Sequence, residues 1–144
     1  IASCAFYNCS DLKKVEFSND SQLQIIDSYA FGLTRIESIT IPSKVTRIGT
    51  KSFGYCSFLK KIEFSKNSEL EIIKKFAFEH SRMRSFIIGC HVKQIGSHAF
   101  SYCSQLKLVE IEGNSKLTSI NKDIFSYSNC TIIMIPSSLH LTFK

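Results

Sequence analysis

The sequence predicts a repeat solenoid: a right-handed coil of about six turns that alternate in length, with a parallel stack of strands and short helical or irregular turns on the opposite side. Three observations indicate this fold class. A Phe recurs at regular intervals, other apolar positions keep fixed distances from it, and length differences fall in the segments between these positions. Residues 1–144 are therefore expected to form a single repeat domain.

The Phe positions set the period. Their separations alternate between 25 and 22 residues, so two turns make a unit of 47. The segment FGYCSFLKKIEFSKNSEL at residues 53–70 returns as FSYCSQLKLVEIEGNSKL at residues 100–117. This regularity indicates duplication of a 47-residue unit. The repeated positions are Phe6, Phe31, Phe53, Phe78, Phe100 and Phe125.

Each turn carries its apolar positions in the same order. An Ile stands five residues before the Phe, and from the second turn on a Leu or Val stands three residues before that Ile. After the Phe comes a single apolar residue, and then two apolar residues separated by one position. This spacing of two predicts a half-buried strand, stacked about 4.8 Å from its neighbours. The pairs are Val15 and Phe17, Ile39 and Ile41, Ile62 and Phe64, Phe86 and Ile88, Val109 and Ile111, and Ile133 and Ile135.

The connections after the strands alternate between a long form, as in FSKNSEL, and a short form, as in IPSKV. A solenoid tolerates such insertions because they lie outside the stacked core. Gly49 and Gly96 follow the inward Ile in short-connection turns, where Asp27 and Asn121 stand in two of the others. Gly, Asp and Asn at this place predict a turn with φ above zero.

Composition excludes several classes of protein. Hydrophobic residues make up 44% of the chain and include 12 Phe, which is enough for a packed core and argues against disorder. The net charge of +6 comes from interleaved basic and acidic residues, so we expect a mixed solvated surface and no nucleic-acid partner. No window is long and apolar enough for a membrane span. Because the chain begins IASCAFYNC, without Met or a signal peptide, we expect a fragment of a longer protein with a partial first repeat.

The six cysteines do not predict a disulfide framework. Cys9, Cys56 and Cys103 share one column in every second turn, so they should lie about 10 Å apart, beyond the roughly 7 Å Cα limit for a disulfide. These three and Cys130 are predicted to be small core residues. Cys4 and Cys90 are predicted to lie at or near the surface.

Neither a catalytic nor a metal site is predicted, and we expect no cofactor and no enzymatic activity. The four histidines share no column, and Cys90 with His91 lacks the two further ligands of a zinc site. No nucleophile elbow, phosphate-binding loop or paired carboxylates occur in the sequence.

The segment IPSKVTRIGTKSFGYCSFLKKIEF resembles the BspA-type leucine-rich repeat, whose pattern runs roughly I-P-x-x-V-x-x-I-G-x-x-A-F-x-x-C-x-x-L-x-x-I-x-I. The first matching copy comprises Ile41, Pro42, Val45, Ile48, Gly49, Phe53, Cys56, Leu59, Ile62 and Phe64, and the second Val92, Ile95, Gly96, Ala99, Phe100, Cys103, Leu106, Val109 and Ile111. The resemblance covers the whole chain and implies a leucine-rich-repeat solenoid. It also implies a cell-surface or secreted location, adhesion, and a host matrix protein, another protein or a glycan as partner.

The outward positions of the strands form the candidate interaction surface. Alternation along a strand places the residues between the inward pairs on the exposed face. Toward the C-terminal end these outward residues become apolar, which is typical of an interface or of a self-associating surface. The candidate residues are Lys14, Glu16, Lys61, Glu63, Ile87, Leu108, Glu110, Ile132 and Met134.

The sequence therefore favours a non-enzymatic protein-interaction module. Two alternatives remain open at this point: an intracellular structural scaffold, which would place the chain in the cytoplasm, and an accessory repeat region of a larger enzyme. The apolar outward residues are also compatible with further repeats, a cap or a second copy covering them.

Overall fold

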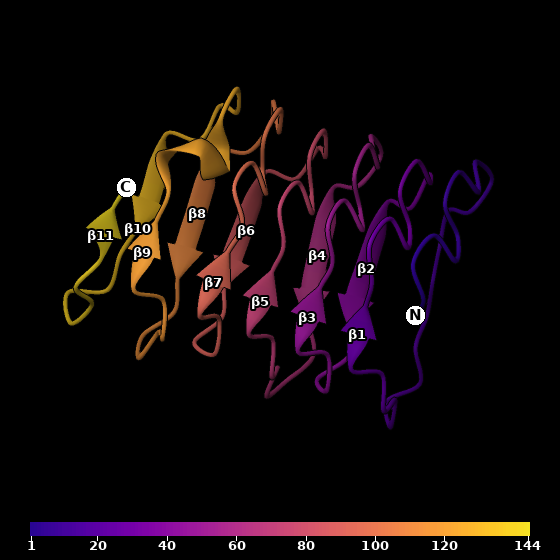
Figure 1. Cartoon of the computed structure of the whole chain (residues 1–144), viewed down its shortest axis with the longest axis horizontal. Helices are drawn as coiled ribbons and strands as arrows, with labels where there is room; N and C mark the ends of the chain where they lie inside the picture. Colours follow the sequence, from indigo (N-terminus) through magenta and orange to yellow (C-terminus); the bar gives the residue numbers. More distant parts are fainter.

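The computed structural model describes all residues 1–144 as an elongated stack of turns, with the two termini at opposite ends (Figure 1). Each complete turn contributes one long strand and one two-residue strand, and the two kinds point in opposite directions (Figure 1). The chain thus coils around a core that lies between two sets of parallel strands. The predicted solenoid is confirmed.

The long strands contain the alternating apolar pairs. Their outward and inward residues alternate between exposed and buried, as in Ser38–Ile41. The long strands are β2 (Ser38–Ile41), β4 (Lys61–Phe64), β6 (Ser85–Ile88), β8 (Leu108–Ile111) and β10 (Ile132–Met134).

A second set of strands passes through the Ile that precedes each repeated Phe from Phe31 on, with Phe143 in place of the Ile in the last strand. No alternation in the sequence predicts this set. Each of these strands has only two residues, too few to show a period of two. They are β1 (Ile25–Ile26), β3 (Arg47–Ile48), β5 (Ile72–Ile73), β7 (Gln94–Ile95), β9 (Ser119–Ile120) and β11 (Thr142–Phe143). Helix is confined to the 3₁₀ turn η1 (Lys122–Phe125), whose N-cap Asn121 accepts from the N–H of Asp123.

The stack of long strands is not continuous, contrary to the expectation of one uninterrupted ladder. β2 pairs with β4, and β6 pairs with β8, which pairs with β10, all in parallel. β4 and β6 are consecutive in the stack but do not pair. The short strands are continuous across the same point, because β3, β5 and β7 pair in order.

The short strands have their own interruption, between β7 and β9. There the long strands are continuous, because β6, β8 and β10 pair in order. The two interruptions thus fall at different turns. At each one the opposite ladder holds the neighbouring turns together, so one side can open without dividing the molecule.

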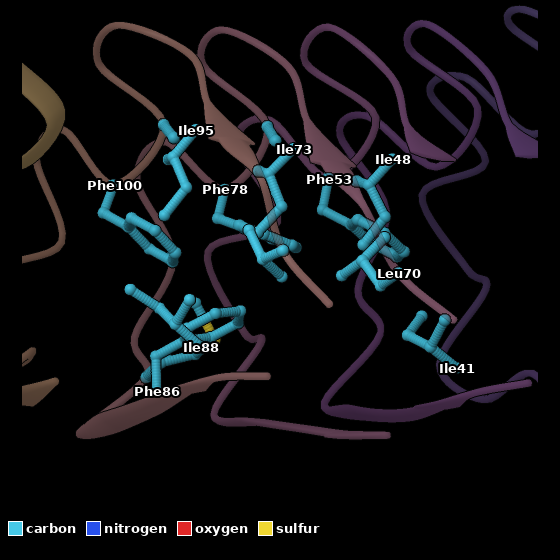
Figure 2. Packing of buried hydrophobic residues seen from close by; sticks show 14 of the residues in the cluster. Ile41, Ile48, Phe53, Leu70, Ile73, Phe78, Phe86, Ile88, Ile95 and Phe100 are labelled. Atoms are coloured by element: carbon cyan, nitrogen blue, oxygen red, sulfur yellow. The ribbon is translucent and has the colours of Figure 1, made fainter. Parts of the chain in front are cut away.

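Aromatic stacking along the solenoid axis fills the core. The rings of Phe31, Phe53, Phe78 and Phe100 are fully buried and stack on one another with centroids 5.3–5.6 Å apart. Figure 2 shows Phe53, Phe78 and Phe100 repeating from turn to turn beside Ile48, Ile73 and Ile95. Burying each ring contributes about 1.5–3 kcal/mol, and each stacked pair about 0.5–1.5 kcal/mol more. Repetition of one residue type thus yields one continuous core.

The first turn departs from the predicted burial. Phe6 is 40% exposed although it stacks on Phe31, and Cys9 is exposed instead of buried. These side chains have a neighbouring turn on one side only, so half of their packing surface faces solvent. Cys130, in the last turn, is half-buried for the same reason. Cys4 is exposed and Cys90 half-buried, in agreement with the prediction.

The two buried cysteines explain why Cys alternates with Thr or Ser in this column. The Sγ of Cys56 donates to the carbonyl of Phe31 at 3.1 Å and lies 3.4 Å from Thr34 Oγ1. Cys103 repeats the arrangement one unit later, with the carbonyl of Phe78 and the hydroxyl of Ser81. A thiol in one turn therefore meets both a carbonyl and a hydroxyl of the preceding turn. Burial raises the pKa of Cys103 to about 11.

The prediction that Gly49 and Gly96 adopt positive φ is wrong. No glycine of the chain has positive φ. These two glycines are required because the previous turn passes too close for a side chain: a Cβ at Gly49 would lie 2.5 Å from the carbonyl carbon of Asp27, and one at Gly96 would lie 2.4 Å from the amide nitrogen of Lys75. Positive φ occurs instead two residues before and two residues after most of the repeated Phe.

Candidate interaction surface

The predicted outward face is present on the long strands. Its N-terminal half contains two charged pairs, each within one turn: Lys14 Nζ lies 2.6 Å from Glu16 Oε1, and Lys61 Nζ lies 2.6 Å from Glu63 Oε1. The uncharged Ser38 and Thr40 of β2 lie between them. The hydrogen bond from Lys14 holds the pKa of the Glu16 carboxyl below its ordinary value. These pairs are solvated, so each contributes little to stability. They neutralise one another locally and leave a polar surface.

Toward the C-terminal end the outward face becomes apolar. Ile132 and Met134 of β10 are 54% and 51% exposed, and Ile87 of β6 is 49% exposed. Leu108 is half-buried and lies beside Ile132 in register, whereas Glu110 lies between Ile87 and Met134. The apolar surface is therefore continuous through Leu108 and Ile132 but is interrupted by a carboxylate on the way to Ile87.

A cleft opens where β4 and β6 fail to pair, and we call it the β4–β6 cleft. Its volume is about 1070 Å³. Its floor is apolar, and the two β4 residues on it are only half-buried although they occupy inward positions. The floor residues are Ile62, Phe64, Leu70, Phe86 and Val92.

Two aromatic rings stand at the split. Phe86 takes a place that Ile takes in the other short-connection turns. Its ring packs edge-on against Phe64 with centroids 5.7 Å apart, and also contacts the ring of Phe100 at 4.7 Å. Figure 2 shows Phe86 and Ile88 projecting from β6 toward the row of stacked Phe. Phe64 and Phe86 thus stand at the positions that Ile111 and Ile133 have on the hydrogen-bonded strands β8 and β10.

The same defect recurs one unit earlier. A second cavity of about 690 Å³ lies between the first turn and β2, and there only Lys14 bridges to Ser38. The strand segments at both openings end in Phe, at Phe17 and Phe64. The third unit has Ile111 at this position, and β8 pairs there with β10. The aromatic or aliphatic identity of this residue is the sequence signal that could have predicted the openings.

The whole repeat matches one known family. The family described as "BspA type Leucine rich repeat region", with 6 copies, matches residues 1–107 and 71–143. The chain belongs to this family. No curated protein matches it.

One solved structure shows the likeness of this BspA-type chain at the level of the fold. The pneumococcal vaccine antigen PcpA has a TM-score of 0.63 at 23% identity, over 90% of this chain and 47% of that one. A leucine-rich cell surface protein of Faecalibacterium prausnitzii has a TM-score of 0.43 at 22% identity, over 94% of this chain and 54% of that one. The BspA-type chain thus spans about half the length of the structures it matches.

The edge of the BspA-type solenoid, where each short strand leads to the next long strand, carries an aromatic ladder that the sequence reasoning missed. Tyr55, His80, Tyr102 and Tyr127 stand two residues after successive Phe, each with φ near 60°. Their rings stack with centroids 4.4–4.8 Å apart. Each ring covers the faces of its neighbours, so the ladder stiffens this edge of the stack. A search for further columns at fixed distance from the Phe would have found it.

Elsewhere in the BspA-type chain, metal-ligating side chains do not form a cluster. Cys90 Sγ lies 3.5 Å from His91 Nδ1, which is 3.1 Å from the carbonyl oxygen of Ser68. No group of three or more His, Cys, Asp or Glu side chains is arranged to hold a metal ion. The structure has no helix with the length and apolar character needed to cross a bilayer.

Proposed function

We propose that this chain is a non-enzymatic protein-interaction module of a cell-surface or secreted protein, and that it acts in adhesion through the outward face of its long strands. The observation that carries this proposal is the apolar end of that face. Ile87, Ile132 and Met134 are each about half exposed. The core does not need them, because the inward positions of the same strands already supply apolar residues in every turn. Exposed apolar surface is typical of binding sites. Membership of a repeat family without catalytic machinery supports a binding role.

The partner proposed is an extracellular matrix protein or another protein, with a surface glycan as the further possibility. A rigid stack can bind through many small contacts with little loss of conformational freedom. The charged N-terminal part of the face, with Lys14, Glu16, Lys61 and Glu63, would supply the polar rim around the apolar part.

The test is a binding measurement with purified chain on immobilised fibronectin, laminin and collagen and on a glycan panel. Ile132→Asp with Met134→Asp should weaken the binding by at least about tenfold, because it places two charges in the contact. Gln94→Asp, which places one charge outside the outward face, is the control, since Gln94 is exposed on a short strand. Equal loss in the control, or no binding to any of these surfaces, would contradict the proposal.

Self-association is the second candidate, favoured by the same apolar residues on β10. Sedimentation velocity distinguishes it from binding to a different protein. A concentration-dependent dimer that dissociates in the Ile132→Asp, Met134→Asp variant would assign the face to a second copy.

A further inference from the structure

We infer that the β4–β6 cleft receives an extended polypeptide segment that alternates apolar and acidic residues, and that this segment pairs with the strand edges as an added strand. The inference deepens the proposed function and rests on it for the nature of the partner. It concerns a different surface from the apolar outward end at Ile132 and Met134. Backbone geometry, the cleft floor and the charges at its rim support it.

The edge of β4 that faces the cleft has unpaired backbone groups. On its other side the N–H of Ser65 donates to the carbonyl of Ile41 at 3.0 Å. Backbone groups of consecutive residues point to opposite sides of a strand, so the N–H and C=O of Ile62 and Phe64 point toward β6. No backbone hydrogen bond joins β4 to β6.

The edge of β6 presents the complementary set. On the side of β8, the N–H of Glu112 donates to the carbonyl of Ile88 at 3.0 Å. By the same alternation, the N–H and C=O of Ser85 and Ile87 point toward β4. The cleft therefore has donors and acceptors on both walls, at the spacing of a parallel ladder. Unpaired strand edges are the surfaces that bind extended peptides by strand addition.

The floor selects for apolar side chains on one face of the added strand. Ile62 and Phe64 are only half-buried, whereas the equivalent Ile39 and Ile41 of β2 are buried. Apolar residues at alternate positions of the segment would cover them. The volume of about 1070 Å³ is slightly above the range of about 300–1,000 Å³ typical of sites that enclose a drug-sized ligand.

The rim selects for acidic residues on the other face. Five cations and two carboxylates line the cleft. Lys60 and Lys61 have carboxylate partners, Glu37 and Glu63. The other three cations have none, and all three are exposed: Lys66, Arg82 and Arg84. Glu112, the second carboxylate of the lining, accepts only from the N–H of Cys90 and offsets one of these cations, so the cleft keeps an excess of positive charge that matches acidic side chains.

The test uses a capped peptide, Thr-Val-Glu-Val-Glu-Val-Thr, and amide hydrogen exchange read residue by residue by NMR. Saturating peptide should slow exchange at Ile62, Phe64, Ser85 and Ile87 by at least about tenfold, because their amides gain or are shielded by backbone partners. The same peptide with Lys in place of Glu should bind at least about tenfold more weakly. Titration by NMR shift gives the Kd of each.

Two variants test the contribution of the rim and that of the walls separately. Arg84→Glu should raise the Kd of the acidic peptide about tenfold or more, and Lys75→Glu, which makes the same charge change on the loop before Phe78, should not. Phe64→Ile with Phe86→Ile should let β4 pair directly with β6, so the four amides become protected without peptide and binding is lost. Circular dichroism confirms that each variant is folded.

Several results would overturn the inference. The four amides could already be as protected as those of β8 in the free chain, which would mean that the cleft is closed. Protection could rise with protein concentration alone, which would assign the cleft to a second copy. The acidic peptide could protect none of them, or bind the Arg84→Glu variant unchanged. Failure of the chain to bind matrix proteins, with peptide binding intact, would instead contradict only the function proposed for the outward face.

Discussion

At the scale of single residues, the same repeat position can be filled for different physical reasons. Gly49 and Gly96 suggest a turn with positive φ, yet the structure shows a close approach of the previous turn. Residue type alone does not separate these causes, because both favour Gly. Cys56 and Cys103 are correctly predicted to be buried, but the hydroxyl that each one meets is visible only in three dimensions.

Gly96→Ala tests the close approach. The added Cβ would overlap backbone atoms of Lys74 and Lys75, which cannot move without shifting the turn, so we expect a loss of about 1–3 kcal/mol or more in unfolding free energy. Gly113→Ala is the control, because no atom lies within 4 Å of the added Cβ, and it should be neutral or slightly stabilising. Urea denaturation measures both. Equal stability of the two variants would refute the steric explanation.

The buried thiols make a second prediction at this scale. Burial raises the pKa of Cys103 to about 11, above its ordinary value, so the unfolded chain loses this proton at lower pH than the folded chain. The corresponding stability is present below about pH 9 and is lost as pH rises toward 11. The decrease in unfolding free energy over this window should therefore be smaller in Cys103→Ala, by about 2–3 kcal/mol. Parallel pH profiles for both proteins would contradict the assignment.

Thiol labelling gives a third residue-scale result. Cys4 and Cys9 are exposed, whereas Cys56 and Cys103 are buried. In native protein at about pH 8, a maleimide should modify the first two within minutes and leave the last two unmodified until denaturant is added. Mass spectrometry of tryptic peptides identifies the sites. Fast modification of Cys56 in the native chain would show that the core is not packed as described.

At the scale of elements, the sequence predicts what depends on periodicity and misses what depends on the fit between turns. The long strands follow from alternation, as in Ile39 and Ile41. The short strands are too brief to show a period. The split between β4 and β6 coincides with the large rings of Phe64 and Phe86, and a pattern that scores Phe and Ile alike as apolar cannot detect it.

Equivalent Phe residues should differ in energetic weight according to their place in the stack. Phe78 is fully buried with rings on both sides, so Phe78→Ala should cost about 3–5 kcal/mol. Phe6 is 40% exposed and stacks only on Phe31, so Phe6→Ala should cost clearly less. Thermal and urea unfolding compare the two. Similar losses would mean that the first turn is covered in solution.

At the scale of the whole molecule, two ladders interrupted at different turns and a continuous column of Phe hold the stack in register. The long-strand side can therefore open at the β4–β6 cleft without separating the two halves. We propose that function lies on the long-strand side. The inward columns are nearly invariant between turns because they form the core, whereas the outward residues and the cleft rim differ from turn to turn and can determine what is bound. The sequence predicts the outward face in its correct orientation but not the cleft.

The most direct measurement is amide hydrogen exchange of the free chain across its five long strands. We predict slow exchange at paired positions such as Val109 of β8, and exchange at least about tenfold faster at Ile62, Phe64, Ser85 and Ile87. Uniform protection of all the long strands would contradict this prediction, because the stack would then be continuous and no edge would be free to receive a partner.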